Sequence, residues 1–240
     1  MIPVLKDRRA RIALIVIFLG ALVLTLPMRL ALGAFGLDKA GMAARDMSGS
    51  VWMGRIEALK VANVDVGTVA AGLSPVQLPI GRARMNLGRR MGRPDDLKGA
   101  ISLSASSFGI DDATASLPLG GLLAPMPLRA VDLSDVSVRF DHGRCSRAQG
   151  RVRIHVGAAI PGMALAQGLS GDALCSGDDL MLPLASQSGM EQINIRVTAD
   201  GRYHARFIVQ KPAPDAVAVL RGSGFAPSGD ALVLAIDGSL

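Results

Sequence analysis

The feature that most constrains the fold of this chain is the alternation of apolar and polar residues that recurs in its second half. Residues 136–140, 152–156, 193–197 and 203–207 place Val, Ile, Ala, Tyr or Phe at every second position, with Ser, Arg, His or Asn between them. Successive side chains of a β-strand point to opposite faces, so this pattern predicts strands with one buried and one solvated face. The dipeptide Asp200-Gly201 separates the last two segments and predicts a hairpin turn.

Other parts of the chain carry weaker signals. Residues 64–69, 101–105 and 232–236 indicate further strands. Pro214-Asp215, followed by the apolar residues 216–220, predicts a short helix, and residues 117–123 predict a second one. The fold class that follows is mainly β, with one curved antiparallel sheet from Val51 to Ile236. We expect the sheet to be shaped like a groove or half-barrel, with one or two short helices against it.

A run of seventeen uncharged residues, IALIVIFLGALVLTLPM, lies between Arg11 and Arg29. This length is close to the ~17–25 residues that a membrane-spanning helix needs. Basic residues precede the run, which predicts a cytoplasmic N-terminus and an exported remainder. A cleaved signal peptide, with its cleavage region at residues 31–34, is the alternative, and either version exports the chain beyond about Asp38.

This interpretation divides the chain into four segments. They are a cytoplasmic basic stub (1–11), a transmembrane anchor (12–34), a connector (35–47) and a periplasmic β domain (48–240).

The composition bears on possible partners. Hydrophobic residues make up 50% of the chain but aromatic residues only 3%, so aliphatic side chains must fill its core. The formal net charge is +6, and a nucleic-acid partner has to be considered for the basic cluster of Arg82, Arg84, Arg89, Arg90, Arg93 and Lys98. No aromatic side chains lie among these residues to stack on bases, so we exclude that partner. A solvated loop is the favoured interpretation, and an anionic membrane surface or an acidic partner is the alternative.

Catalytic and cofactor motifs are absent from the sequence. It contains no nucleophile elbow, phosphate-binding loop or zinc-protease motif. Three histidines lie far apart without further ligands at metal-site spacing, namely His142, His155 and His204. Asp111-Asp112 and Asp178-Asp179 are adjacent pairs, whose members would point to opposite faces of a strand, and we interpret both as turn or strand-end residues. We expect no enzyme, no metal and no cofactor.

The two cysteines, Cys145 and Cys175, both follow the predicted anchor. In an oxidising compartment a free thiol is a liability, whereas a pair can close a bridge. Both lie near predicted strands and Gly-containing turns, so both can lie at one end of the sheet. They have no companions for a metal site and do not form a C-x-x-C motif. We therefore predict a structural disulfide between them.

The only tryptophan, Trp52, lies in the octet SGSVWMGR, between Gly49 and Gly54. Glycines on both sides let another backbone approach, so we predict that Trp52 packs on the first strand of the domain. A position at the membrane–water interface is the functional alternative.

The stretch SGSVWMGRIEAL resembles the N-terminal signature of the type II secretion system protein N family, called GspN. The residues that carry this signature are Gly49, Val51, Trp52, Gly54 and Arg55, followed by a Leu-Ser-Pro element at Leu73, Ser74 and Pro75. Later segments are similar to the family in the same order: Cys145 to Gly150, Leu169 to Gly177, Asp200 to Tyr203, and Asp237 to Leu240. The chain departs from the family at Ala70 and Ala71, where an aromatic residue is expected.

The resemblance implies a non-catalytic, single-pass protein of the bacterial inner membrane with a cytoplasmic N-terminus and a periplasmic main domain. It would assist assembly or scaffolding in the machinery that exports folded periplasmic proteins across the outer membrane. Its partners would be other inner-membrane or periplasmic subunits of that apparatus. The alternative is a lipid-binding or lipid-transfer module like AsmA and LptC proteins, because the aliphatic strands would line an apolar groove as readily as they would fill a core.

Overall fold

The computed structural model describes residues 8–29, 42–61, 64–89, 97–119, 126, 128–157, 165 and 167–239. Its strands are β1 (Met42–Ala43), β2 (Asp46–Gly49), β3 (Gly54–Val61), β4 (Val64–Leu73), β5 (Ala83–Arg89), β6 (Leu97–Leu103), β7 (Ser107–Pro118), β8 (Leu128–Asp141), β9 (Arg144–Val156), β10 (Leu169–Asp172), β11 (Leu174–Ser176), β12 (Asp179–Ala185), β13 (Glu191–Val197), β14 (Arg202–Gln210), β15 (Ala226–Ser228) and β16 (Ala231–Ser239). Its helices are α1 (Arg8–Leu24), the 3₁₀ helix η3 (Pro75–Ile80) and α3 (Pro214–Gly222).

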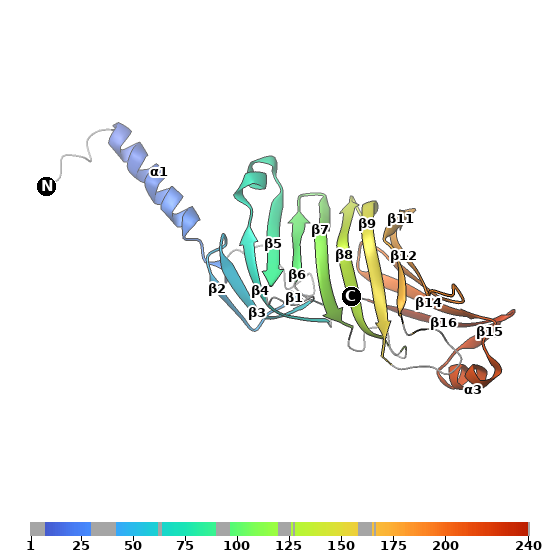
Figure 1. The fold of residues 1–240 in the computed structure, drawn as a ribbon. Helices are drawn as coiled ribbons and strands as arrows, with labels where there is room; N and C mark the ends of the chain where they lie inside the picture. The colour runs from blue at the N-terminus through green and yellow to red at the C-terminus, as the bar shows by residue number, and fades with distance from the viewer. Residues whose placement is uncertain are drawn as a thin grey trace.

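The sixteen strands of this described part form one open sheet in which all paired strands are antiparallel. The strand order is β1-β3-β4-β5-β6-β7-β8-β9-β10-β12-β13-β14-β16-β15, with β2 also paired to β3 and β11 to β12. Figure 1 shows α1 projecting from the β2–β3 end of this sheet, and α3 at the opposite end. The mainly β prediction with one antiparallel sheet is confirmed.

The strands match the prediction at the β13–β14 hairpin, but the sheet extends further toward the N-terminus than predicted. The hairpin around Asp200-Gly201 is confirmed as β13–β14, in which Val197 lies opposite Tyr203. The sheet is wider than predicted, because it begins at Met42 and therefore includes β1 and the start of β2, which lie in the segment interpreted as a connector.

One of the two predicted helices is confirmed. Near residue 216 the chain forms α3, with Pro214 in its first turn and with Ala216 and Leu220 buried. The helix predicted at residues 117–123 is wrong at its start, because Leu117 and Pro118 belong to β7 and lie opposite Val131 and Ala130. An apolar run of this length fits the end of a buried strand as well as a helix. Residues 120–123 lie outside the described part of the chain.

The core lies between distant parts of the twisted sheet. One large apolar cluster joins β8 and β9 to β13, β14 and α3, and it includes Val138, Ile154, Ile193, Phe207 and Leu220. In Figure 1 the later strands accordingly cross behind the earlier ones. A second, smaller cluster lies at the N-terminal end of the sheet, around residues of β3, β4 and β6. Aliphatic side chains dominate both clusters, as the composition requires.

The predicted disulfide is confirmed. Cys145 on β9 and Cys175 on β11 are bonded, with their Cα atoms 5.5 Å apart. In the sheet ladder β9 pairs with β8 and β10, whereas β11 pairs with β12. Two backbone hydrogen bonds flank the bridge, from the Cys145 N–H to the Asp178 carbonyl oxygen (2.8 Å) and from the Ala173 N–H to the Gly150 carbonyl oxygen (2.9 Å), so the bridge reinforces a direct contact between β9 and the segment that contains β11.

No helix in the described ranges is long and apolar enough to cross a membrane.

Candidate functional site

The octet SGSVWMGR forms the hairpin that joins β2 to β3. Gly49 and Gly54 lie opposite each other in the ladder, and residues 50–53 form the loop. Gly49 has a φ angle of +86°, and a Cβ atom there would lie 2.5 Å from the Met53 carbonyl oxygen. Only glycine adopts this conformation without strain and leaves this space free. The backbone of the hairpin therefore requires Gly49.

This hairpin holds the chain that follows α1. The N–H group of Val51 donates a 2.9 Å hydrogen bond to the Leu26 carbonyl oxygen. Met28 is almost fully buried, and a Cβ atom on Gly54 would lie 2.2 Å from its sulfur. Gly54 therefore makes room for Met28, a residue that the sequence pattern assigned to the anchor.

Arg29 extends this contact along β2. Its Nε donates a 2.9 Å hydrogen bond to the Met47 carbonyl oxygen, and its guanidinium group pairs with the Asp46 carboxylate. Hydrogen bonds from the Met47 backbone N–H and from Arg29 lower the pKa of Asp46. Pro27 and Ser50 add an isolated antiparallel bridge. Residues 26–29 are thus fixed to the edge of the sheet.

The second part of the signature packs against the first. The Leu73 N–H group donates a 2.8 Å hydrogen bond to the Val51 carbonyl oxygen. Val51 and Leu73 form a small buried cluster, against which Leu26 and Trp52 pack. The chain then turns into η3, where Ser74 is the N-cap and Pro75 follows it. The two signature elements, some twenty residues apart in the sequence, form one junction between α1 and the sheet.

Trp52 lies in the β2–β3 loop rather than on the first strand. Its side chain is half-buried against the Val51–Leu73 cluster. The close backbone approach occurs at Gly72 on β4, where a Cβ atom would lie 2.5 Å from the Trp52 carbonyl oxygen. Trp52 is therefore a packing residue of the junction, as expected, but in a different position.

An open cleft of about 570 Å³ lies beside Trp52. Its lining includes Trp52, Met53 and Arg55 of the octet, together with the small residues Ala70 and Gly72 of β4 and Gly88 of β5. The resemblance to the family indicated an aromatic residue where Ala70 and Ala71 stand. The small side chains in this chain leave open a space that a larger side chain would occupy.

The Gly72 contact leads to a prediction. We expect Gly72→Ala to displace the Trp52 loop, because the new Cβ atom would meet a backbone oxygen that has little freedom to move. Overpacking of this kind costs about 1–3 kcal/mol. The fluorescence of the only tryptophan should shift to longer wavelength, and the urea midpoint should fall. Gly88→Ala is the matched control on the adjacent strand, because the nearest atom to its Cβ would be 3.9 Å away. Equal spectra for the two variants would contradict the prediction.

The later family-like segments also have packing roles. Tyr203 lies opposite Gly238, and a Cβ atom on Gly238 would lie 2.4 Å from the Tyr203 hydroxyl oxygen. A Cβ atom on Gly171 would lie 1.9 Å from the Pro183 carbonyl oxygen. Because these glycines accommodate neighbouring groups, the segments that contain them specify close approaches within the sheet.

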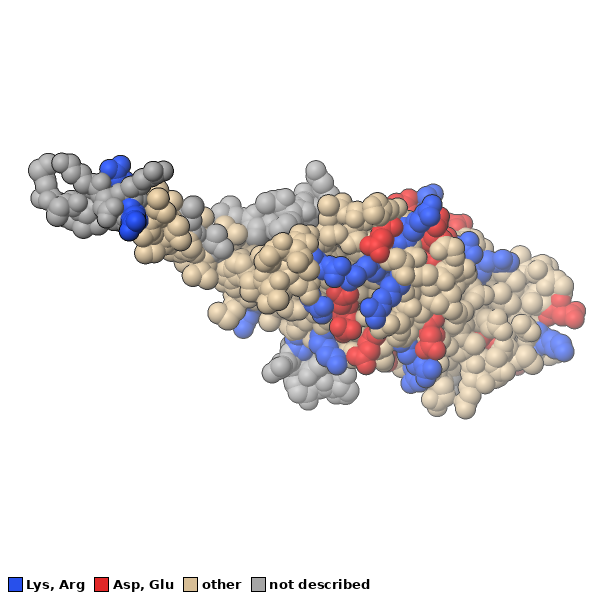
Figure 2. Space-filling view, turned by 90° about the horizontal axis from the view of Figure 1, so that it is seen from above, with Lys and Arg blue, Asp and Glu red and all other residues tan. Residues whose placement is uncertain are grey.

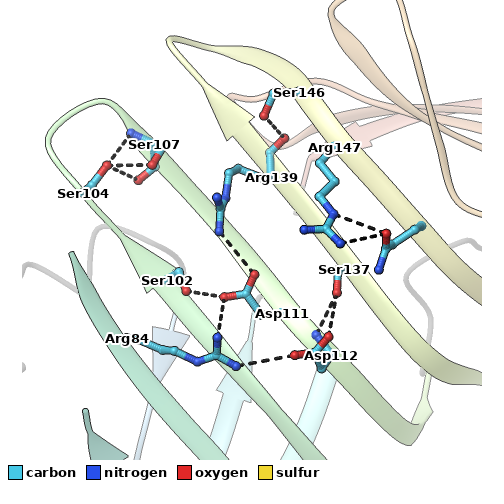
Figure 3. A network of polar contacts seen from close by, with 11 residues as sticks. Arg84, Ser102, Ser104, Ser107, Asp111, Asp112, Ser137, Arg139, Ser146 and Arg147 are labelled. Carbon is cyan, nitrogen blue, oxygen red and sulfur yellow. Dashed lines mark hydrogen bonds and ion pairs between the residues drawn. The ribbon is translucent and has the colours of Figure 1, made fainter. Parts of the chain in front are cut away.

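A network of polar side chains crosses β5 to β8 on one face of the sheet (Figure 3). The Arg84 guanidinium group lies 3.5 Å from carboxylate oxygens of both Asp111 and Asp112. Arg139 lies 3.5 Å from the other Asp111 oxygen, and the Ser102 hydroxyl donates to Asp111. Ser137 accepts a 2.9 Å hydrogen bond from the Asp112 N–H. Figure 2 shows basic and acidic side chains intermingled over the middle of the molecule.

The structure differs from the sequence-based interpretation of the Asp111-Asp112 pair and of the basic cluster. Asp112 has a φ angle of +51° within a register shift between β7 and β8, so the backbone twists and both Asp111 and Asp112 reach Arg84. Arg84, Arg89 and Lys98 belong to strands rather than to a solvated loop. The acidic partners of Arg84 lie on β7 and that of Lys98, Asp135, lies on β8, so no pattern near either basic residue in the sequence indicates them.

A second polar contact involves Asp132 and His155. Burial raises the pKa of Asp132, but hydrogen bonds from Ser116 and His155 and the nearby positive charges outweigh it, so the pKa is lowered overall. His204 likewise contacts Asp237 across β14 and β16. Both histidines are partly exposed, as predicted from their polar strand positions, but each has a carboxylate partner.

The lowered pKa of Asp132 predicts a pH dependence. A carboxyl group whose pKa is lower in the folded state stabilises the fold above its unfolded pKa of about 3.9 and loses that contribution as the pH falls through the folded value. We therefore expect the urea midpoint of Asp132→Asn to fall less than that of the wild type between pH 6 and pH 2.5. Ser116→Ala, which removes one hydrogen bond to the carboxylate, should show an intermediate slope. Identical slopes for all three proteins would refute the assignment.

Within the ranges that the structure describes, no three His, Cys, Asp or Glu side chains are grouped so that they could hold a metal ion. Asp178 and Asp179 lie at the β11–β12 turn and pair with Arg144 and Arg196, respectively. Their interpretation as turn and strand-end residues is confirmed.

The fold and the junction define a β-sheet scaffold joined at one end to an apolar N-terminal helix, with its signature residues used to fasten the two together. The particular family follows from comparison with known proteins: the model of type II secretion system protein N matches residues 40–223, and the chain belongs to this family. No curated protein and no solved structure gave a significant match. The protein is therefore a component of the type II secretion system, as the sequence resemblance implied.

Proposed function

We propose that this protein is a non-catalytic inner-membrane component of the type II secretion machinery that assists its assembly. In this proposal α1 is the single-pass anchor, its N-terminus is cytoplasmic, and the sheet lies in the periplasm. The observation that carries the proposal is the junction itself, in which the family signature fixes the chain leaving α1 to a rigid sheet.

The surface of α1 supports the anchoring part. Apolar side chains along the helix are largely exposed, among them Ile15 at 55%, Phe18 at 63% and Leu24 at 68%. Exposed apolar patches of this size on a protein indicate contact with a membrane or another protein. Arg9 and Arg11 lie at the beginning of the helix, and its last turn contains no basic residue. Figure 2 shows basic side chains at the far end of this N-terminal projection. This charge bias is typical of a cytoplasmic helix start.

The sheet supports the scaffolding part. Ionisable side chains near the middle of the sheet pair with one another across strands, as Arg84 and Arg139 do with Asp111. Such pairing stabilises a surface without preparing a reactive group. Partners of this surface would be other inner-membrane or periplasmic subunits of the apparatus.

Two experiments test this proposal. A reporter that is active only in the periplasm should work when fused after Leu240, and a reporter active only in the cytoplasm should be silent there. A photo-reactive residue at Met53, which is 83% exposed, should cross-link to subunits of the apparatus in native membranes. The reverse reporter pattern would refute the topology, and cross-links to unrelated proteins alone would refute the scaffolding role.

A lipid-handling module remains a second candidate because of one observation. Several aliphatic side chains of β5, β7 and β8 that pack against one of the two core clusters are only partly buried, namely Met85, Leu87, Ile110, Leu117, Val131 and Leu133. Partly exposed aliphatic side chains of this kind suit contact with acyl chains. Transfer of a fluorescent lipid between two vesicle populations by the protein distinguishes the candidates, because a lipid carrier should move lipid between membranes and a membrane-anchored scaffold should not.

A further inference from the structure

The cleft beside Trp52 carries an unbalanced positive charge. Arg55 is the only ionisable residue among those that line it. Its side chain is exposed and forms no ion pair with any residue that the structure describes. Arg84, on the nearby strand β5, contrasts with it because two carboxylates contact its guanidinium group. The cleft therefore favours an anionic ligand.

The rest of the cleft lining is mainly apolar, with Ser48 and Asn86 as its polar side chains. Met53 is 83% exposed, and the half-buried Trp52 presents an amphipathic ring beside it. On β4, the lining residues Ala70 and Gly72 contribute little more than backbone. The cleft has a volume of about 570 Å³ and opens widely to solvent, so it has room for one part of a larger ligand rather than enclosing a whole small molecule. An arginine beside a tryptophan and an exposed methionine suits a ligand with an anionic group and an apolar part.

The cleft lies where the chain leaves α1. Val51, next to Trp52, is hydrogen-bonded to Leu26, two residues beyond the end of the helix. The largely exposed apolar side chains of α1 lead directly to this point. With α1 inserted in a bilayer, the cleft would lie at the level of the lipid headgroups, where basic residues attract anionic lipids.

We propose that this cleft binds an anionic phospholipid of the membrane that surrounds α1. The lipid phosphate lies on the guanidinium group of Arg55, which suits phosphate oxygens because its donors form a planar fork. The apolar part of the lipid that adjoins the phosphate lies against Trp52 and Met53. The site rests on the proposed membrane anchoring and gives the junction a second role, since a bound lipid would fix the orientation of the sheet relative to the membrane.

The single tryptophan provides the test. Full-length protein is reconstituted in phosphatidylcholine vesicles that contain a minor fraction of either brominated phosphatidylglycerol or brominated phosphatidylcholine, and quenching of Trp52 fluorescence is measured. We expect stronger quenching by the brominated phosphatidylglycerol at equal content. Arg55→Gln should reduce this preference about fivefold, which corresponds to the loss of one basic residue at an anionic surface.

Matched variants and a flotation assay separate the outcomes. Lys60→Gln removes the same charge from an exposed position on β3 outside the cleft, and it should keep the preference. Arg55→Lys should retain part of it because the charge remains. Equal quenching by the two brominated lipids, or an equal loss in the Lys60 variant, would overturn the lipid site while leaving the anchor intact. Protein that fails to float with either vesicle would overturn both proposals.

Discussion

Replacing both cysteines, Cys145→Ser with Cys175→Ser, is expected to lower the free energy of unfolding by about 3–4 kcal/mol. The bridge closes a segment with a sequence separation of 30, and the chain-entropy model assigns a stabilisation of this size to such a loop. For a domain of about 200 residues this corresponds to a fall in Tm of roughly 6–16 °C. Thermal unfolding of the full-length protein in detergent, followed by circular dichroism, measures the change.

Two controls make this result interpretable. Reduced wild-type protein should have the same Tm as the double variant, because both lack the same covalent link. The double alanine variant should behave similarly, which excludes an effect of hydroxyl groups at the buried position 145 and the partly buried position 175. If both cysteines react with an alkylating reagent in the denatured, unreduced protein, the bridge does not form in solution.

Gly150→Ala should produce the other large loss of stability, about 2–5 kcal/mol. Gly150 has a φ angle of +98°, and a Cβ atom there would lie 2.5 Å from both the Asp135 carbonyl oxygen and the Val136 Cα atom. Strain in the left-handed region costs roughly 1–2 kcal/mol, and overpacking against a backbone adds about 1–3 kcal/mol. Urea unfolding at neutral pH measures the sum.

Gly143→Ala separates the two contributions. Gly143 also has a positive φ angle, +78°, but no atom lies within 4 Å of the position of its Cβ. It lies at the β8–β9 turn, so its substitution introduces the conformational strain without the clash. We expect Gly143→Ala to lose only about 1–2 kcal/mol. A loss equal to that of Gly150→Ala would show that β8 and β9 do not approach each other at Gly150 as closely as the structure indicates.

Local patterns predicted those parts of the fold that depend on neighbouring residues. The alternation at residues 193–197 and 203–207, with Asp200-Gly201 between them, predicted β13 and β14 and their shared buried face. The proline and the apolar stretch after it predicted α3. These predictions succeeded because the direction of a strand side chain and the start of a helix depend on the chain within a few residues. The same reasoning failed at Leu117, because a short apolar run has the same local pattern at the end of a buried strand as in a helix.

The candidate site was only partly predictable. The single tryptophan between Gly49 and Gly54 was enough to predict that Trp52 is a packing residue. Nothing in the octet itself indicates that Gly54 makes room for the buried Met28, or that Gly72 lies against the Trp52 carbonyl group. Arg55 was identified only as part of the family signature, and its unpaired state in the described part of the chain became visible only once the neighbouring strands were in place.

The sequence by itself determined the strand-forming segments, their buried faces, the cysteine pair and the family. The tertiary structure alone decided that residues 26–29 are fixed to the β2–β3 hairpin, and that Asp111 and Asp112 both reach Arg84. The reason is that period-two patterning specifies which face of a strand a side chain takes, but a register shift such as the one at Asp112 reverses that assignment locally. Backbone hydrogen bonds, such as the one from the Val51 N–H to the Leu26 carbonyl oxygen, form between residues of any type. The pattern of side chains therefore does not indicate which segments these bonds bring together.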